Sequence, residues 1–214
     1  MALTKFEYNS FDVTPVASNA FAFNSTPNGL TTAAAGAMNL ISTSTISSGV
    51  STVSIASGID STYDTYLFKY INIHPASNDV FFQVNFRDGS TAYDATKTTT
   101  SFFAYHNEAG NDQSLAYKTS ADLANGTGVQ QLSFDSVGNG NDESSCGELF
   151  LFNPSSTTFV KHFIARTHGY SDDDRAYSNF SAGYFNTTSA IDAIQFANAS
   201  GNMDAGDICL YGIL

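Results

Sequence analysis

Positively charged side chains are scarce in this sequence. Its 214 residues include eight Lys and Arg against twenty Asp and Glu, which gives a formal net charge of −12. The eight cations are scattered from Lys5 to Arg175 and form no cluster. Nucleic-acid binding requires basic side chains that displace counterions from phosphates, so the composition argues against DNA and RNA as partners. The same charge disfavours docking on anionic lipid and favours solubility through acidic repulsion.

Long apolar runs are also missing. No window approaches the length of a membrane span, and residues 1–8 lack an apolar stretch of signal-peptide length. We therefore expect synthesis in a cytosol and no membrane insertion. Only two cysteines occur, Cys146 and Cys209, and each lies in a strand-like run. We interpret them as free, small apolar residues of the core, with a disulfide as the weaker alternative for a cytosolic chain.

Signatures of catalysis are absent as well. The sequence contains no Gly-x-Ser-x-Gly elbow, phosphate-binding loop or His-Glu-x-x-His motif, and neither cysteine carries a nucleophile signature. Paired carboxylates about 5 to 10 Å apart serve glycosidases, but among twenty acids some pair meets that spacing by chance. An enzyme is therefore possible, but the sequence offers no support for one, and we expect no cofactor.

The spacing of possible metal ligands gives little support for a metal site. The four histidines are His74, His106, His162 and His168. The closest two, His162 and His168, would share one face of a regular strand about 20 Å apart, too far to share a metal ion. The acidic segments 139–143 and 172–174 are rich in oxygen ligands, but neither has EF-hand spacing. We predict no metal site and leave calcium open only if such loops converge in space.

Strand signals dominate the sequence after Gly58. In residues 80–86, four apolar side chains alternate with other residues, which is the period of a half-buried strand. Further strand-like runs are residues 50–55, 65–74, 101–106, 147–152, 158–168 and 180–185. At the end of the chain, apolar runs 190–196 and 208–213 flank a segment rich in turn residues, which predicts a closing β-hairpin. The only helix candidate is a short turn near residues 120–125.

These signals predict an all-β fold. About eight to ten strands without a long helical period favour an antiparallel β-sandwich or jelly roll. We expect two regions, an extended amino-terminal attachment arm at residues 1–58 and a sandwich domain at residues 59–214. Residues 25–58 consist largely of Ser, Thr, Ala and Gly, so they should form an arm, long loops or thin strands leaning on the main body.

Aromatic residues supply the candidate contact sites. Four phenylalanines are spaced along the otherwise polar amino terminus and are predicted to anchor it to another protein: Phe6, Phe11, Phe21 and Phe23. Tyrosines beside polar groups are typical of sugar-binding or protein-contact surfaces, because the ring stacks while amides and carboxylates orient the ligand. We assign this role to Tyr93, Tyr170 and Tyr177 in turn-rich segments. The strand tyrosines are interpreted as packing residues.

Four segments carry a resemblance to a known family. They are IDSTYDTYLFKYINIHPASNDVFF (59–82), FFAYHNE (102–108), GELFLFNPSSTTFVKHFIARTHGY (147–170) and AGYFNTTSAIDAIQFANASGNMDAGDICLYGI (182–213). Together they resemble small β-sandwich domains of bacteriophage virion structural proteins and tail fibres, those of marine phages and cyanophages especially. The likeness covers roughly residues 58–214 and is faint before that.

The resemblance implies a non-enzymatic module, commonly a homotrimer, that is assembled in the host cytoplasm and displayed on the outside of the virion. The leading expectation is a tail fibre or appendage component that recognises the host surface, where a glycan is a candidate ligand. A capsid decoration protein that stabilises the head is the alternative. A glycan-degrading depolymerase is less favoured because the chain is short and lacks the repeats of a β-helix.

Overall fold

The computed structural model describes residues 19–23, 30–34 and 37–214. The chain divides into two units, residues 1–39 and 40–214. In the first unit, β1 (Asn19–Phe23) pairs antiparallel with β2 (Leu30–Ala34). All regular elements in the described part of the chain are strands, so the short helix expected near residues 120–125 does not form. Among the same residues no helix is long and apolar enough to cross a membrane.

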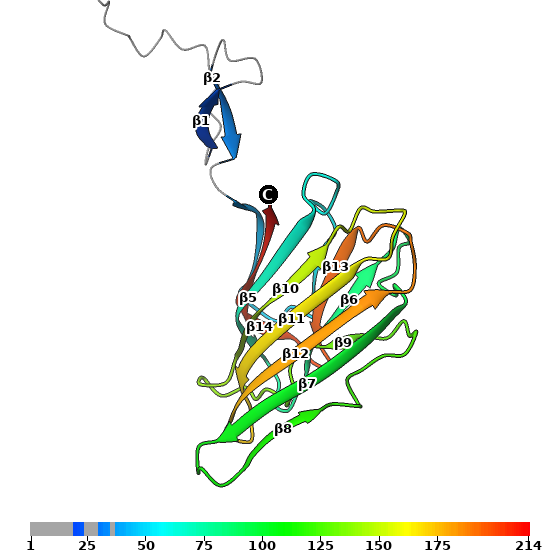
Figure 1. The fold of residues 1–214 in the computed structure, drawn as a ribbon. Helices are drawn as coiled ribbons and strands as arrows, with labels where there is room; N and C mark the ends of the chain where they lie inside the picture. The colour runs from blue at the N-terminus through cyan, green and yellow to red at the C-terminus, as the bar shows by residue number, and fades with distance from the viewer. Residues whose placement is uncertain (1–18, 24–29, 35–36) are drawn as a thin grey trace, which may run out of the picture. The chain divides into compact units, whose positions relative to one another are not determined.

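The second unit is a β-sandwich of two antiparallel sheets (Figure 1). The eight-stranded sheet contains, in spatial order, β3 (Met38–Ile46), β14 (Met203–Ile213), β5 (Thr65–Pro75), β10 (Ser145–Phe152), β11 (His162–Tyr170), β12 (Arg175–Phe185), β7 (Lys97–Asn107) and β8 (Gln113–Tyr117). The four-stranded sheet contains β4 (Thr52–Ile55), β13 (Ala193–Asn198), β6 (Phe82–Arg87) and β9 (Gln130–Gln131). The expected all-β sandwich is therefore confirmed.

Early strands pair with late ones in a nested way. β3 and β5 flank β14, whereas β4 and β6 flank β13. This pairing agrees with a jelly roll, which remains a prediction. It also shows that the expected closing hairpin is wrong, because β13 and β14 belong to different sheets. Ala199–Asn202 form the connection between the sheets, and the amide of Ala76 donates to the carbonyl oxygen of Asn202 at 2.8 Å.

The core lies between the two sheets and is rich in aromatic rings. The alternation expected for residues 80–86 is confirmed, since Phe82, Val84 and Phe86 are each at most 1% exposed. Phe82 stacks on Phe196 of β13 with 5.9 Å between ring centroids, and Tyr70 of β5 meets Phe82 edge-on at 5.3 Å. The first contact lies within the four-stranded sheet, and the second joins the two sheets directly.

Polar contacts cover the inner face of the remaining strands. β7 and β12 extend beyond the small sheet, and residues 118–137 lie against them. The side-chain amide of Asn179 donates to the carbonyl oxygen of Leu132 at 2.9 Å, and Phe134 stacks on Phe103 at 3.6 Å between centroids. Residues 118–137 thus cover the inner face of β7 and β12, whereas the edge strand β8 is exposed along most of its length. The outer face of the large sheet is the one that points away from the four-stranded sheet.

The division between the two units differs from the predicted one. The expected boundary lay at residue 58, but β3 and β4 precede it and both pair within the sandwich sheets. Residues 40–58 therefore belong to the second unit. Of the predicted anchors, Phe6 and Phe11 lie outside the described residues, and Phe21 and Phe23 lie in β1. Their attachment role stays a prediction.

His74 joins three segments at one end of the sandwich. Its Nδ1 lies 2.6 Å from Oδ1 of Asp204, and its Nε2 lies 3.0 Å from the carbonyl oxygen of Gly140. Both partners are acceptors, so only the imidazolium can donate both hydrogen bonds. Partial burial lowers the pKa of His74, but these hydrogen bonds, together with the charges of Asp204 and Glu143, outweigh it and raise the pKa above its usual value.

We expect the His74 contacts to stabilise the fold more in mild acid than in mild alkali. Because the folded-state pKa is raised, the stabilisation is complete below about pH 6.5 and is lost as the pH rises through the folded pKa. In urea titrations, His74→Gln should lower the unfolding midpoint clearly near pH 6 and much less near pH 8.5. His106→Gln, at an exposed position, is the control and should show no such pH dependence. An equal loss at both pH values for His74→Gln would contradict the imidazolium assignment.

Candidate ligand-binding face

The outer face of the eight-stranded sheet is built around β11. Along this strand, odd-numbered residues from 163 to 169 are buried and even-numbered residues from 162 to 168 are exposed. His162 and His168 therefore share the outer face, as expected, and six residues of extended strand separate them by about 20 Å. Between them, the same face carries Ile164, which is 52% exposed, and Arg166. Phe102 of β7 and Tyr184 of β12 are also exposed on this face, so the apolar surface extends over three strands, as contact surfaces often do.

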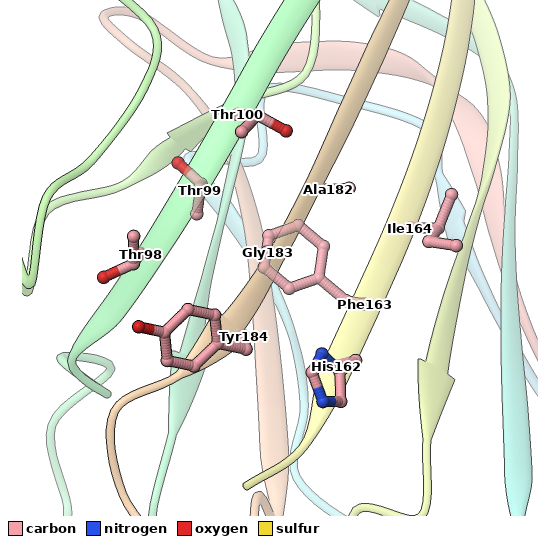
Figure 2. A pocket seen from close by; sticks show the side chains of 9 residues that line it. All are labelled: Thr98, Thr99, Thr100, His162, Phe163, Ile164, Ala182, Gly183 and Tyr184. Atoms are coloured by element: carbon pink, nitrogen blue, oxygen red, sulfur yellow. The ribbon is translucent and has the colours of Figure 1, made fainter.

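A shallow hollow of about 480 Å³, here called the first hollow, lies over β7, β12 and the start of β11 (Figure 2). The register places His162 opposite Tyr184, which is in turn opposite Thr98. The rings of His162 and Tyr184 are 6.1 Å apart between centroids and tilted by 46°. The next row consists of Ile164, Ala182 and Thr100. The hollow thus combines rings, hydroxyl groups and one exposed aliphatic side chain.

Small residues on β12 create the first hollow. Ala182 places only a methyl group between Ile164 and Thr100. Behind it, Gly183 is packed so tightly that a Cβ would lie 2.8 Å from the ring of Phe163. Neighbouring groups also fix the rim, because Asn186 accepts a hydrogen bond from the Thr98 hydroxyl at 3.0 Å and donates one to the Tyr184 hydroxyl at 3.4 Å. The site is therefore positioned by strands rather than by loops.

A second hollow of about 400 Å³ lies further along β11, toward β10 and β5. Its side chains include Lys69, Glu148, Arg166 and His168, and its lining also includes Gly147 and Tyr70. The register places Glu148 between Lys69 on one side and Arg166 on the other. The Arg166 guanidinium also lies over the Phe180 ring, 5.3 Å from its centroid. This second hollow is charged, whereas the first is not.

The structure separates the three predicted contact tyrosines. Tyr177 is only 1% exposed and its hydroxyl lies 2.8 Å from that of Ser145, so its predicted role in ligand contact is wrong for this conformation. Tyr93 follows β6, beside Arg87, and Tyr170 ends β11, where it donates to Asp174 at 2.9 Å. That hydrogen bond raises the pKa of Tyr170 above its usual value.

Tyr93 and Tyr170 lie near opposite ends of β7. The loop of Tyr93 leads into this strand, whereas Tyr170 pairs with Ala176, which pairs with His106 near the end of the strand. An eleven-residue strand spans about 33 Å, so the two tyrosines cannot contact one small ligand together. Their individual contact roles remain predictions. Tyr184, interpreted from the sequence as a packing residue, is instead 37% exposed and lines the first hollow.

The acidic loops do not gather their oxygens at one point. The carboxylates of Asp172, Asp173 and Asp174 bind Ser136, Arg175 and Tyr170 respectively. Within residues 37–214, no group of three or more His, Cys, Asp or Glu side chains is arranged to hold a metal ion. Both cysteines are free; Cys209 is buried, and Cys146 is half-buried on the outer face.

No protein-family model matches this chain, and no curated protein matches it. The resemblance to bacteriophage virion proteins therefore stays a prediction from the sequence. What the molecule itself offers is a β-sandwich with two adjoining hollows on the outer face of its larger sheet. Both are shallow and are formed by side chains of neighbouring strands.

Proposed function

We propose that this protein is a non-enzymatic structural component of a bacteriophage virion, carried by a tail fibre or appendage, and that it contacts the host surface. The resemblance over residues 58–214 supports the virion assignment. A rigid β-sandwich that displays a ligand-binding face suits this role, because strands hold contact residues in fixed positions. The strongly acidic composition keeps such an exposed module soluble.

The first hollow is the observation that carries the host-contact role. Its volume of about 480 Å³ falls within the range of small-molecule sites. The rings of Tyr184 and His162 offer faces for the apolar side of a sugar, while the hydroxyl groups of Thr98 and Thr100 offer hydrogen bonds. A shallow site of this kind binds weakly by itself. Several copies on one particle, as in the expected homotrimer, would combine into useful avidity.

We expect Tyr184→Ala to reduce binding of the protein to host cells about tenfold, because stacking on an aromatic ring contributes on the order of 1 kcal/mol. The measurement is binding of fluorescently labelled protein to intact host cells by flow cytometry. Tyr93→Ala and Tyr170→Ala are matched controls at the two ends of the sheet. If only Tyr93→Ala or Tyr170→Ala reduced cell binding, the contact site would lie in the loops at that end of the sheet. Undiminished binding by Tyr184→Ala would refute the first hollow as the contact site.

The separate unit at residues 1–39 supports an attachment role for the amino terminus. Such an anchor serves a tail appendage and a capsid decoration protein equally well, so decoration of the head remains the alternative. The boundary at residue 40 identifies the informative truncation, because removal of residues 1–58 would also delete β3 and β4 from the sandwich.

A further inference from the structure

Most cations of this acidic protein are already engaged. Arg87 pairs with Asp192 at 2.9 Å, and Arg175 pairs with three carboxylates, of which that of Asp173 is nearest at 2.7 Å. Three lysines are buried instead of ion-paired. Lys97 and Lys161 are at most 1% exposed, and Lys118 is half-buried against the rings of Phe81 and Phe134.

Lys69 and Arg166 are the exceptions among residues 37–214. Neither forms an ion pair with a carboxylate of the described residues, although Glu148 lies between them in the register of the sheet. Both line the second hollow, where His168 adds an imidazole. In a protein with a net charge of −12, the two unpaired cations of residues 37–214 therefore line the same hollow.

We propose that the second hollow binds the anionic group of an acidic glycan. Lys69 and Arg166 hold a carboxylate of the sugar through charge-assisted hydrogen bonds, and Glu148 accepts hydrogen bonds from its hydroxyl groups. Elsewhere the acidic surface repels such a ligand, so the two cations determine where it binds. This inference rests on the proposed function and names the ligand class of the same face.

The two hollows are placed to bind one oligosaccharide. Ile164 lines the first and Arg166 the second, and these are successive outward side chains of β11. The row from His162 to His168 is about 20 Å long. An extended acidic oligosaccharide lying along β11 would therefore place one sugar ring beside Tyr184 and a charged sugar over Glu148. The first hollow supplies stacking and the second supplies charge recognition.

A pair of matched probes tests the proposal: a fluorescent oligogalacturonate and the same oligomer with its carboxylates converted to methyl esters. By fluorescence anisotropy with the full chain, we expect the acid to bind at least about tenfold more tightly than the ester, as a charge-assisted contact predicts. Arg166→Gln and Lys69→Gln should each weaken binding of the acid about tenfold without affecting the ester. Glu148→Gln should strengthen binding of the acid, whereas Glu108→Gln, an exposed control, should leave it unchanged.

Other outcomes contradict the inference. Equal binding of acid and ester, or binding of neither, would overturn it. Displacement of a bound probe by inorganic phosphate as effectively as by the free oligogalacturonate would assign the hollow to a simple anion instead of a sugar. If Tyr184→Ala reduces binding to host cells but Arg166→Gln and Lys69→Gln do not, the host-contact role is supported and the proposal of an acidic glycan ligand is contradicted. These substitutions lie on the outer face and outside the core, so they are expected to leave the thermal unfolding curve nearly unchanged, which checks that the variants fold.

Discussion

Replacing Phe196 with alanine is expected to lower the free energy of unfolding by about 3–5 kcal/mol, the usual cost of truncating a buried phenylalanine. Phe196 is fully buried on β13, where its ring lies 6.0 Å from that of Phe68 and 6.1 Å from that of Tyr70, centroid to centroid. Both neighbours belong to the other sheet. The substitution therefore opens a cavity at the junction of the two layers, and urea denaturation followed by fluorescence or circular dichroism measures the loss.

Phe102 provides the control for this prediction. It is 45% exposed on the outer face of β7, so Phe102→Ala removes the same atoms without leaving a core cavity. Its cost should stay below about 1 kcal/mol. Comparable losses for the two variants would mean that Phe196 is not at the centre of the core and that the packing of the two sheets is wrong.

Gly147→Ala is expected to destabilise the protein by about 2–4 kcal/mol, because the site has no space for a methyl group. A Cβ at this position would overlap the carbonyl oxygen of Arg166 and lie 2.5 Å from the Tyr70 ring. Tyr70 cannot move aside easily, since it is fully buried and its hydroxyl lies 2.6 Å from that of Thr167. The measurement is the shift of the urea midpoint at constant slope.

The matched control is Gly128→Ala. The nearest atom to a Cβ at residue 128 is in Leu123 at 3.5 Å, an ordinary contact distance. This variant should change the free energy of unfolding by no more than about 0.5 kcal/mol. If Gly147→Ala proved equally harmless, β10 and β5 could not pack around Tyr70 as described, and the lining of the second hollow would be different.

The sequence predicted most strands of the sandwich because hydrophobic alternation follows burial. Residues 80–86 show it, whereas residues 65–74 contain a continuous apolar run, and both segments form strands that contact the core. β3 has mostly small and polar residues, so its composition indicated an arm as readily as a strand. The hairpin error at the carboxyl terminus has another cause. Turn residues show where the chain reverses, but not which sheet the next strand joins.

The candidate face was harder to predict than the fold. Tyr177 and Tyr184 belong to the same strand, yet one is buried and the other exposed, because the direction of each side chain depends on the register of β12 with its neighbours. A local signal did exist in residues 162–168, where Ile164 occurs among the polar residues of one face. The first hollow was not visible in the sequence, since it arises where Ala182 meets side chains from β7 and β11.

Under the proposed function, the two hollows give the larger sheet a role in ligand contact in addition to packing. Its inner face builds the core through residues such as Phe163, and its outer face presents residues of the same strand to solvent. The strand β11 therefore carries core residues on one face and the proposed contact residues on the other. Substitutions at its even-numbered positions should change binding with little effect on folding, whereas substitutions at odd-numbered positions should change folding first.

Immunogold labelling of intact phage particles with antibody against this chain tests the central claim most directly. We predict gold at the tail fibres or appendages, where host contact takes place. Gold distributed over the head would instead support a capsid decoration protein and contradict the role in adsorption. Particles without any gold, despite detection of the chain in infected cells, would contradict the assignment to the virion itself.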